Sequence, residues 1–82
     1  MTIAHTPAIE RVARVLAGLR ASANGEGDLA SAGDLVDRSW PQFADDAHAV
    51  LSTLREPDEA MARVGDSAVW TAMIAAALGE GR

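Results

Sequence analysis

The sequence contains no cysteine and no tyrosine, and it has only one phenylalanine. Without cysteine, the chain cannot form a disulfide bridge, a thiolate zinc site or a cysteine nucleophile. Lysine is also absent, so the seven basic side chains are all arginines. Beside the alanine-rich composition, this usage indicates a GC-rich coding bias and carries no functional signal.

Long apolar runs are also missing. No stretch approaches the run of about 18 consecutive apolar residues that is needed to span a bilayer. Residues 1–7 show no basic segment followed by an apolar run, which is the pattern of a secretory signal. We therefore expect a soluble cytoplasmic protein without a membrane partner. Its 82 residues suffice for a single helical domain, 1–82, with a small core, and small helical domains often gain stability by self-association.

Apolar residues recur at helical spacing along most of the chain, and nowhere do β-branched and aromatic residues alternate as in a strand. The pattern predicts an all-α fold, a small orthogonal or up-down bundle of four to five short helices. We place these helices at residues 7–23, 29–38, 41–55, 57–64 and 67–78. The second is expected to be short or irregular, because Gly33 interrupts its pattern.

Local signals mark several helix ends. Trp40-Pro41 predicts an extended step before the third helix, because a proline ring disfavours α geometry in the preceding residue. Asp66 or Ser67 can cap the last helix, and Gly79 ends it. The side chains expected on the apolar, core-facing sides are Ile9, Val12, Ala13, Leu16, Leu19, Phe43, Ala47, Val50, Leu51, Leu54, Ala60, Met61, Val64, Val69, Trp70, Met73, Ile74, Ala77 and Leu78.

Candidate metal ligands are few. Asp45 and His48 lie three residues apart on a predicted helix and can face one ion, but two ligands do not make a site. Asn24, Glu26 and Asp28 alternate as in a calcium loop, yet leucines occupy the positions that need a glycine and a bidentate glutamate. We expect no metal site and no bound cofactor.

No catalytic motif surrounds any of the serines. Neighbouring acids such as Asp45 and Asp46 point about 100° apart on a helix, so they cannot share a proton. We therefore expect no enzymatic activity. The Gly-Asp-Ser-Ala segment at residues 65–68 is similar to the Asp-Ser-Leu motif of acyl carrier proteins, but it lacks the leucine and lies too near the end of the sequence for that fold. An acyl-carrier-like role is the least favoured alternative.

The net charge of −5 is unevenly distributed. Residues 1–24 carry three arginines against one glutamate, a balance of +2, so the rest of the chain carries −7. Arg11 and Arg14 are the only candidates for a basic surface, and the acidic remainder repels phosphate. We expect no nucleic-acid binding, and we expect these arginines to pair with acids of the same chain or of a neighbouring subunit.

Trp40 and Trp70 stand out in a chain with so few aromatic residues. Core packing is the default interpretation of both. Trp40 lies at a predicted junction before a helix, where a half-exposed indole can anchor a protein interface. Together with Met73, Arg11 and Arg14, the two tryptophans are our candidate interface residues.

Residues 49–61 contain a Leu-Arg-Glu-Pro step, and residues 69–78 contain Trp-Thr-Ala-Met-Ile. This combination resembles small helical proteins of alphaproteobacteria and their phages, which share a Leu-Arg-Glu-Pro-x-Glu-Ala-Met … Trp-x-x-Met-Ile pattern and have no assigned function. The resemblance covers the C-terminal half of the chain. Through a phage or mobile-element origin, it implies that binding a protein partner is more plausible than metabolism.

We therefore expect a small, acidic, non-enzymatic interaction protein that self-associates, with a homodimer as its simplest form, and whose other partner is unknown. The alternative is a phage-type acidic inhibitor that binds a host nucleic-acid-handling or defence protein. Its affinity for a basic partner would fall with salt, because salt screens charge attraction.

Overall fold

The structure, a computed structural model, describes residues 3–23 and 29–80. These residues form helices joined by turns, with no strand among them, so the all-α prediction is confirmed. The segment 24–28, which held the calcium-loop-like pattern, lies outside the described residues. The elements are α1 (Ala8–Ala23), α2 (Leu29–Ser39), the 3₁₀ helix η1 (Trp40–Phe43), α3 (Ala44–Thr53), α4 (Glu59–Val64) and α5 (Ser67–Ala77).

The extended step predicted at Trp40 is wrong. α2, η1 and α3 follow one another without a break, and Ser39, which precedes η1, has φ −105° and ψ −16°. Pro41 explains the change of helix type, because it has no N–H for the carbonyl of Asp37 and its ring would crowd that oxygen. A 3₁₀ turn accepts proline in its first turn and redirects the chain into α3.

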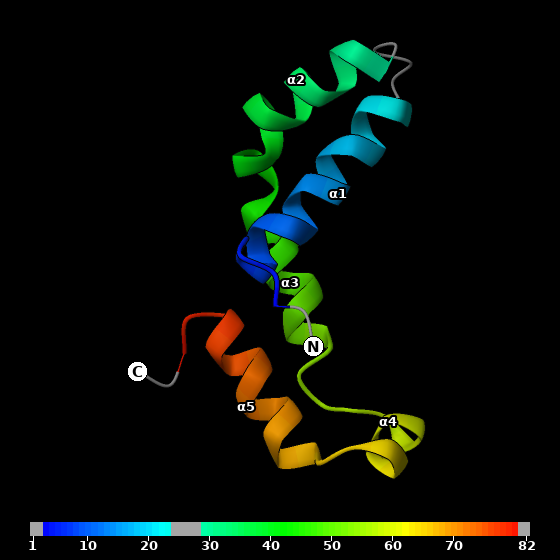
Figure 1. The fold of residues 1–82 in the computed structure, drawn as a ribbon, viewed down its shortest axis with the longest axis vertical. Coiled ribbons are helices and arrows are strands. Elements are labelled where there is room, and N and C mark those ends of the chain that lie inside the picture. The colour runs from blue at the N-terminus through cyan, green and yellow to red at the C-terminus, as the bar shows by residue number, and fades with distance from the viewer. Residues whose placement is uncertain (1–2, 24–28, 81–82) are drawn as a thin grey trace.

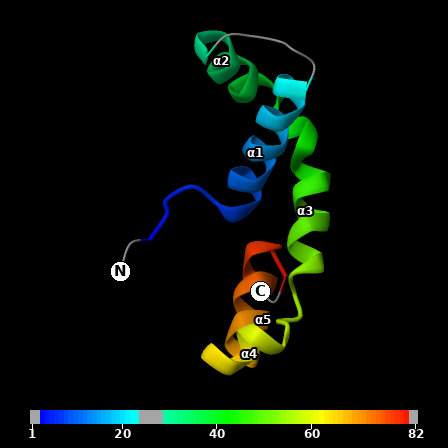
Figure 2. The same ribbon diagram turned by 90° about the vertical axis from the view of Figure 1, so that its right-hand side faces the viewer.

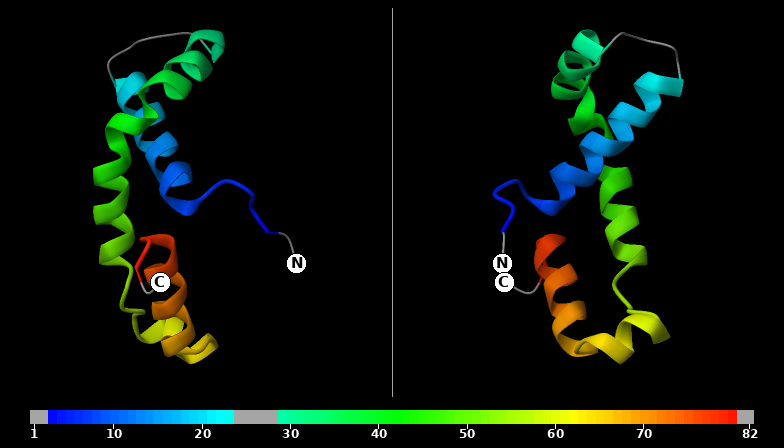
Figure 3. Two further views of the ribbon diagram at one scale, coloured as in Figure 1. Left: turned by 90° about the vertical axis from the view of Figure 1, so that its left-hand side faces the viewer. Right: turned by 45° about the vertical axis from the view of Figure 1, so that its right-hand side comes forward.

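The helices are arranged in two groups along the long axis of the molecule. α1 packs against α2, η1 and α3, whereas α5 packs against α3 (Figure 1). α4 and α5 lie at the end opposite α2 (Figure 2), and both views of Figure 3 keep α4 away from α1 and α2. The Cα radius of gyration is 15.1 Å, compared with about 12 Å for a compact domain of this length. The described fold is therefore elongated.

Small side chains make up most of the core. Ala13 of α1 and Ala47 of α3 are fully buried, at 0% exposure. Alanine allows two helices to approach closely, but it removes little apolar area from water. The core therefore contributes a modest hydrophobic stabilisation. Among the described residues, the buried side chains are Ala13, Ala17, Ala21, Ala47, Leu51 and Ile74.

Several core predictions are wrong. Val64 and Ala60 are exposed, with Val64 at 88%, because none of the described helices packs closely over α4. On α1 the buried row consists of Ala13, Ala17 and Ala21, and Leu19 is left exposed. Val50, Leu54, Val69 and Met73 were also expected on core-facing sides and are exposed as well.

Candidate interaction surfaces

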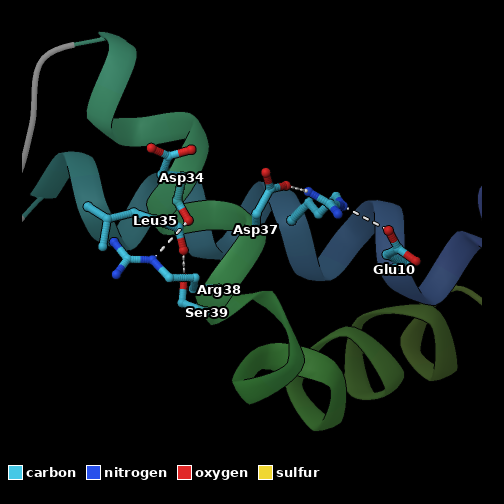
Figure 4. Close-up of polar contacts among 7 residues, drawn as sticks. Glu10, Asp34, Leu35, Asp37, Arg38 and Ser39 are labelled. Carbon is cyan, nitrogen blue, oxygen red and sulfur yellow. Dashed lines mark hydrogen bonds and ion pairs between the residues drawn. The ribbon is translucent and has the colours of Figure 1, made fainter.

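Arg14 connects α1 to α2 and η1. Its Nε donates to Glu10 Oε2 at 2.8 Å and its Nη1 donates to Asp37 Oδ1 at 2.7 Å. Its guanidinium carbon lies 5.7 Å from the centroid of the Trp40 ring, within range of a cation–π interaction. Dashed lines at the carboxylates of Glu10 and Asp37 in Figure 4 mark these two hydrogen bonds. The hydrogen bond that Arg14 donates to Asp37, and then the one that it donates to Glu10, raise the pKa of Arg14 above its ordinary value.

The structure therefore brings Arg14 and Trp40 together within the chain. Trp40 is half-buried, and Arg14 pairs with acids of its own chain, which was one of the two arrangements expected for it. Arg11 differs: it is exposed, and its Nε donates to the carbonyl of Thr6 at 3.1 Å. The contacts of Arg14 serve the packing of α1 against α2 and η1, whereas the bond of Arg11 holds the segment before α1.

Side chains also stabilise the last turn of α2, just before η1. Arg38 Nε donates to the carbonyl of Asp34 at 3.3 Å, and the Ser39 hydroxyl donates to the carbonyl of Leu35 (Figure 4). Such bonds to carbonyls one turn back are typical of helix ends, where regular hydrogen bonding stops. These two bonds hold the last turn of α2, directly before Trp40, in place.

The C-terminal end of α3 is held by side chains from α5. Trp70 Nε1 donates to the carbonyl of Leu54 at 2.7 Å, and Thr71 Oγ1 donates to the carbonyl of Arg55 at 3.1 Å. Carbonyls at a helix C-terminus lack helical partners, so these two bonds satisfy groups that the turn would otherwise leave to water. Trp70, a candidate interface residue, therefore positions α5 against α3.

Both ends of α5 have well-defined caps. Asp66 accepts hydrogen bonds from the N–H groups of Ala68 at 2.9 Å and Val69 at 3.1 Å, so Asp66 is the N-cap and Ser67 is not. Gly79, at φ +80°, ends the helix as predicted. The N–H of Gly79 donates to the carbonyl of Ala76, and the N–H of Glu80 donates to the carbonyl of Ala75. This pair of bonds is a Schellman motif.

This C-terminal cap also places Glu80 against Arg55, two residues after the end of α3. The carboxylate of Glu80 forms an ion pair with the guanidinium of Arg55. Arg55 therefore contacts α5 on one side through its carbonyl and the residues after α5 through its side chain. Sequence reasoning missed this role of Arg55, Thr71 and Glu80. The structure shows that the Leu-Arg-Glu-Pro step and the Trp-x-x-Met-Ile segment touch, and no local sequence signal pointed to this contact.

One face of α5 carries only apolar side chains and is exposed. We call this face the α5 surface; it includes Met73, a candidate interface residue that is 60% exposed, and Val69 at 54%. Trp70 and Met73 are near neighbours on one helix but differ in environment, since Trp70 is half-buried against α3. The α5 surface consists of Ala68, Val69, Ala72, Met73 and Ala76.

Two cavities lie beside these contacts in the described part of the chain. One, of about 250 Å³, lies between α4 and the start of α5; it is lined mainly by apolar groups, including Met61, Val64 and Trp70. The other, of about 300 Å³, lies between α1, α2 and η1, and Arg20 and Gln42 give it a mixed lining. The first cavity adjoins the N-terminal end of α5.

The remaining sequence candidates do not form a site in the described part of the chain. His48 Nδ1 lies 3.4 Å from the hydroxyl of Ser52 on the same helix. Across residues 3–23 and 29–80, no three His, Asp or Glu side chains are grouped so as to hold a metal ion. Within the same ranges, every helix is too short or too polar to cross a bilayer.

No protein-family model matches this sequence, and comparisons with curated proteins and with solved structures find no match. A function for the chain therefore has to be argued from its own surfaces.

Proposed function

We propose that the protein is a non-enzymatic interaction protein that acts through self-association. The observation that supports it best is that the folded chain leaves many large apolar side chains in water. They come from α1, α3, α4 and α5 as well as from the segment before α1. These side chains are Ile3, Val15, Leu19, Val50, Leu54, Val64, Val69 and Met73.

The amount of exposed surface supports the same proposal. The chain exposes 6100 Å², whereas a compact monomer of this mass is expected to expose about 4700 Å². An interface of standard size removes about 800 Å² from each partner. One such interface fits within the excess surface of each copy, and it would bury apolar area that the small alanine core does not.

The net charge of −5 sets how association depends on salt. Two acidic copies repel one another at low ionic strength, and added salt screens that repulsion. Self-association should therefore strengthen as salt rises. The acidic-inhibitor alternative predicts the opposite dependence on salt: the affinity for a basic partner should fall as salt rises, because salt weakens the charge attraction.

Sedimentation equilibrium between about 1 µM and about 500 µM tests the proposal, since linkage makes association depend on protein concentration. We expect the weight-average mass to rise from the monomer value of 8.5 kDa towards that of a dimer, and to rise at lower concentration when NaCl is added. A mass that stays at 8.5 kDa over the whole range would contradict it.

A further inference from the structure

The cavity between α1, α2 and η1, which we call the α1–η1 cavity, is lined by short segments of all three elements. Its volume is about 300 Å³, at the lower end of the range for small-molecule sites. Helical spacing explains the lining, because residues three or four apart share one face of a helix. α1 contributes Ala17, Arg20 and Ala21, and α2 contributes Leu35 and Ser39.

The apolar part of the lining matches the body of a small organic molecule. Ala17 and Ala21 are buried, and Leu35 of α2 and Phe43 of η1 are half-buried. The two alanines have short side chains, so they leave space that larger residues would fill. Pockets for small molecules typically combine such apolar walls with a few polar groups that fix the orientation of the ligand.

Arg20 and Gln42 supply the polar groups of the α1–η1 cavity. Both are exposed, and within residues 3–23 and 29–80 no ion pair joins Arg20 to an acid. The hydroxyl of Ser39 already donates its hydrogen to the carbonyl of Leu35. The side-chain donors that remain are therefore the guanidinium and the amide, and the described lining residues include no acid.

Arg20 differs in this respect from the other arginines that the structure describes. Three of them form ion pairs with carboxylates, and two donate to backbone carbonyls. The cavity between α4 and α5 offers no comparable cation, and Asp66 in its lining already accepts two backbone N–H groups. Of the two described cavities, the α1–η1 cavity is therefore the one equipped to bind an anion.

We propose that the α1–η1 cavity binds a small organic carboxylate with a compact apolar or aromatic body. The guanidinium of Arg20 binds the carboxylate, because its planar array of N–H donors matches the two carboxylate oxygens. The amide of Gln42 donates a further hydrogen bond, and the apolar body lies against Leu35 and Phe43. This ligand site goes beyond the self-association proposed above and does not depend on it.

Charge favours a carboxylate over a more highly charged anion. The whole chain carries −5, which repels anions at a distance, whereas residues 1–24, which include Arg20, carry a balance of +2. One carboxylate matches the guanidinium that lines the α1–η1 cavity. Inorganic phosphate carries more charge at neutral pH, and it has no apolar part that could contact Leu35 and Phe43.

Benzoate and benzamide are a matched pair of probes, because they share a ring and differ in the charge of the polar group. NMR titration of the isotope-labelled full chain reports binding residue by residue. We expect benzoate to bind with a Kd on the order of 1 mM, since so small a ligand makes few contacts, and to shift the signals of Ala17, Ala21 and Gln42. Benzamide should bind at least about tenfold more weakly, because it cannot form charge-assisted bonds with Arg20.

Arg20→Gln and Arg63→Gln are the matched variants. Both arginines are exposed, so the folded chain should tolerate either change. Arg63 lies on α4, outside the α1–η1 cavity. We expect R20Q to weaken the binding of benzoate by about tenfold or more, because the charge-assisted bonds are lost, and R63Q to leave it at the wild-type value.

Several results would overturn the proposal. The first is the absence of a saturable shift with benzoate up to about 50 mM, far above the expected Kd. Equal binding of benzoate by R20Q and the wild type is another, and so is binding of benzamide as tight as that of benzoate. Shifts that are largest on α4 or α5 would reject the α1–η1 cavity as the site. Inorganic phosphate that shifts the same signals with equal affinity would reject the apolar body as part of the recognition.

Discussion

The indole Nε1 of Trp70 donates a hydrogen bond of 2.7 Å to the backbone carbonyl of Leu54, across sixteen residues of sequence. This bond ties α5 to the end of α3, and the bond from Thr71 to the next carbonyl reinforces it. Since α5 contacts the rest of the described chain mainly through α3, these bonds orient the C-terminal helices. They also keep the far face of α5 turned away from α3.

Trp70→Phe should therefore destabilise the fold by about 1 kcal/mol, the usual net value of one hydrogen bond. Phenylalanine keeps a six-membered aromatic ring but loses the five-membered part of the indole, which carries the donor to Leu54. Trp40→Phe is the matched control, because the role shown for Trp40 is the contact of its ring with Arg14. Urea unfolding at one fixed protein concentration measures both. Equal stability of W70F and the wild type would show that the bond contributes nothing.

Capping of α5 gives a prediction about two adjacent residues. Asp66→Ala removes the acceptor for the N–H groups of Ala68 and Val69, so it should cost about 1 kcal/mol, typical of an N-cap. Ser67→Ala should change stability by less than about 0.5 kcal/mol, as for an exposed helix position without such a role. Thermal unfolding followed by circular dichroism compares them. A larger loss in S67A than in D66A would contradict the cap assignment.

Helix positions could be predicted from the sequence because they depend on local signals. Apolar spacing and residues such as Pro41, Asp66 and Gly79 act within one or two turns of the chain. Even the misjudged step at Trp40 was local: proline was correctly identified as a breaker, but a 3₁₀ turn resolves the same steric conflict without an extended residue.

Burial and interhelical contacts could not be predicted in the same way. Leu19 and Ala17 are both apolar residues of α1, so either could be buried on the basis of its type alone. Ala17 is the buried one, because close helix packing favours the smaller side chain. Val64 satisfies the apolar pattern but has no helix above it. The bonds from Trp70 and Thr71 to the end of α3 depend on the direction of the chain between α3 and α5, which no local pattern specifies.

Replacing glycine by alanine should change the stability of the fold in opposite directions at two positions. Gly79 has φ +80°, so Gly79→Ala should destabilise the fold by about 1 kcal/mol and disturb the pairing of Glu80 with Arg55. Gly33 lies within α2, and a Cβ there would meet no atom within 4 Å. Gly33→Ala should therefore stabilise the fold by about 0.5–1 kcal/mol through helix propensity. Urea midpoints measure both, and a shift in the same direction would contradict the backbone argument.

Leu51 and Leu19 test how much of the stability depends on the small core. Leu51 is 6% exposed and Leu19 is 62% exposed. Leu51→Ala should cost about 2–4 kcal/mol, because it leaves a cavity among buried side chains, whereas Leu19→Ala should cost less than about 0.5 kcal/mol. In a chain with so few large buried side chains, the first loss is enough to reduce the helical signal at 25 °C substantially. Leu51→Met, which keeps the volume, should restore most of that signal. Circular dichroism at matched concentration compares the variants, and an L51A chain as stable as L19A would mean that burial of Leu51 on α3 does not stabilise the fold.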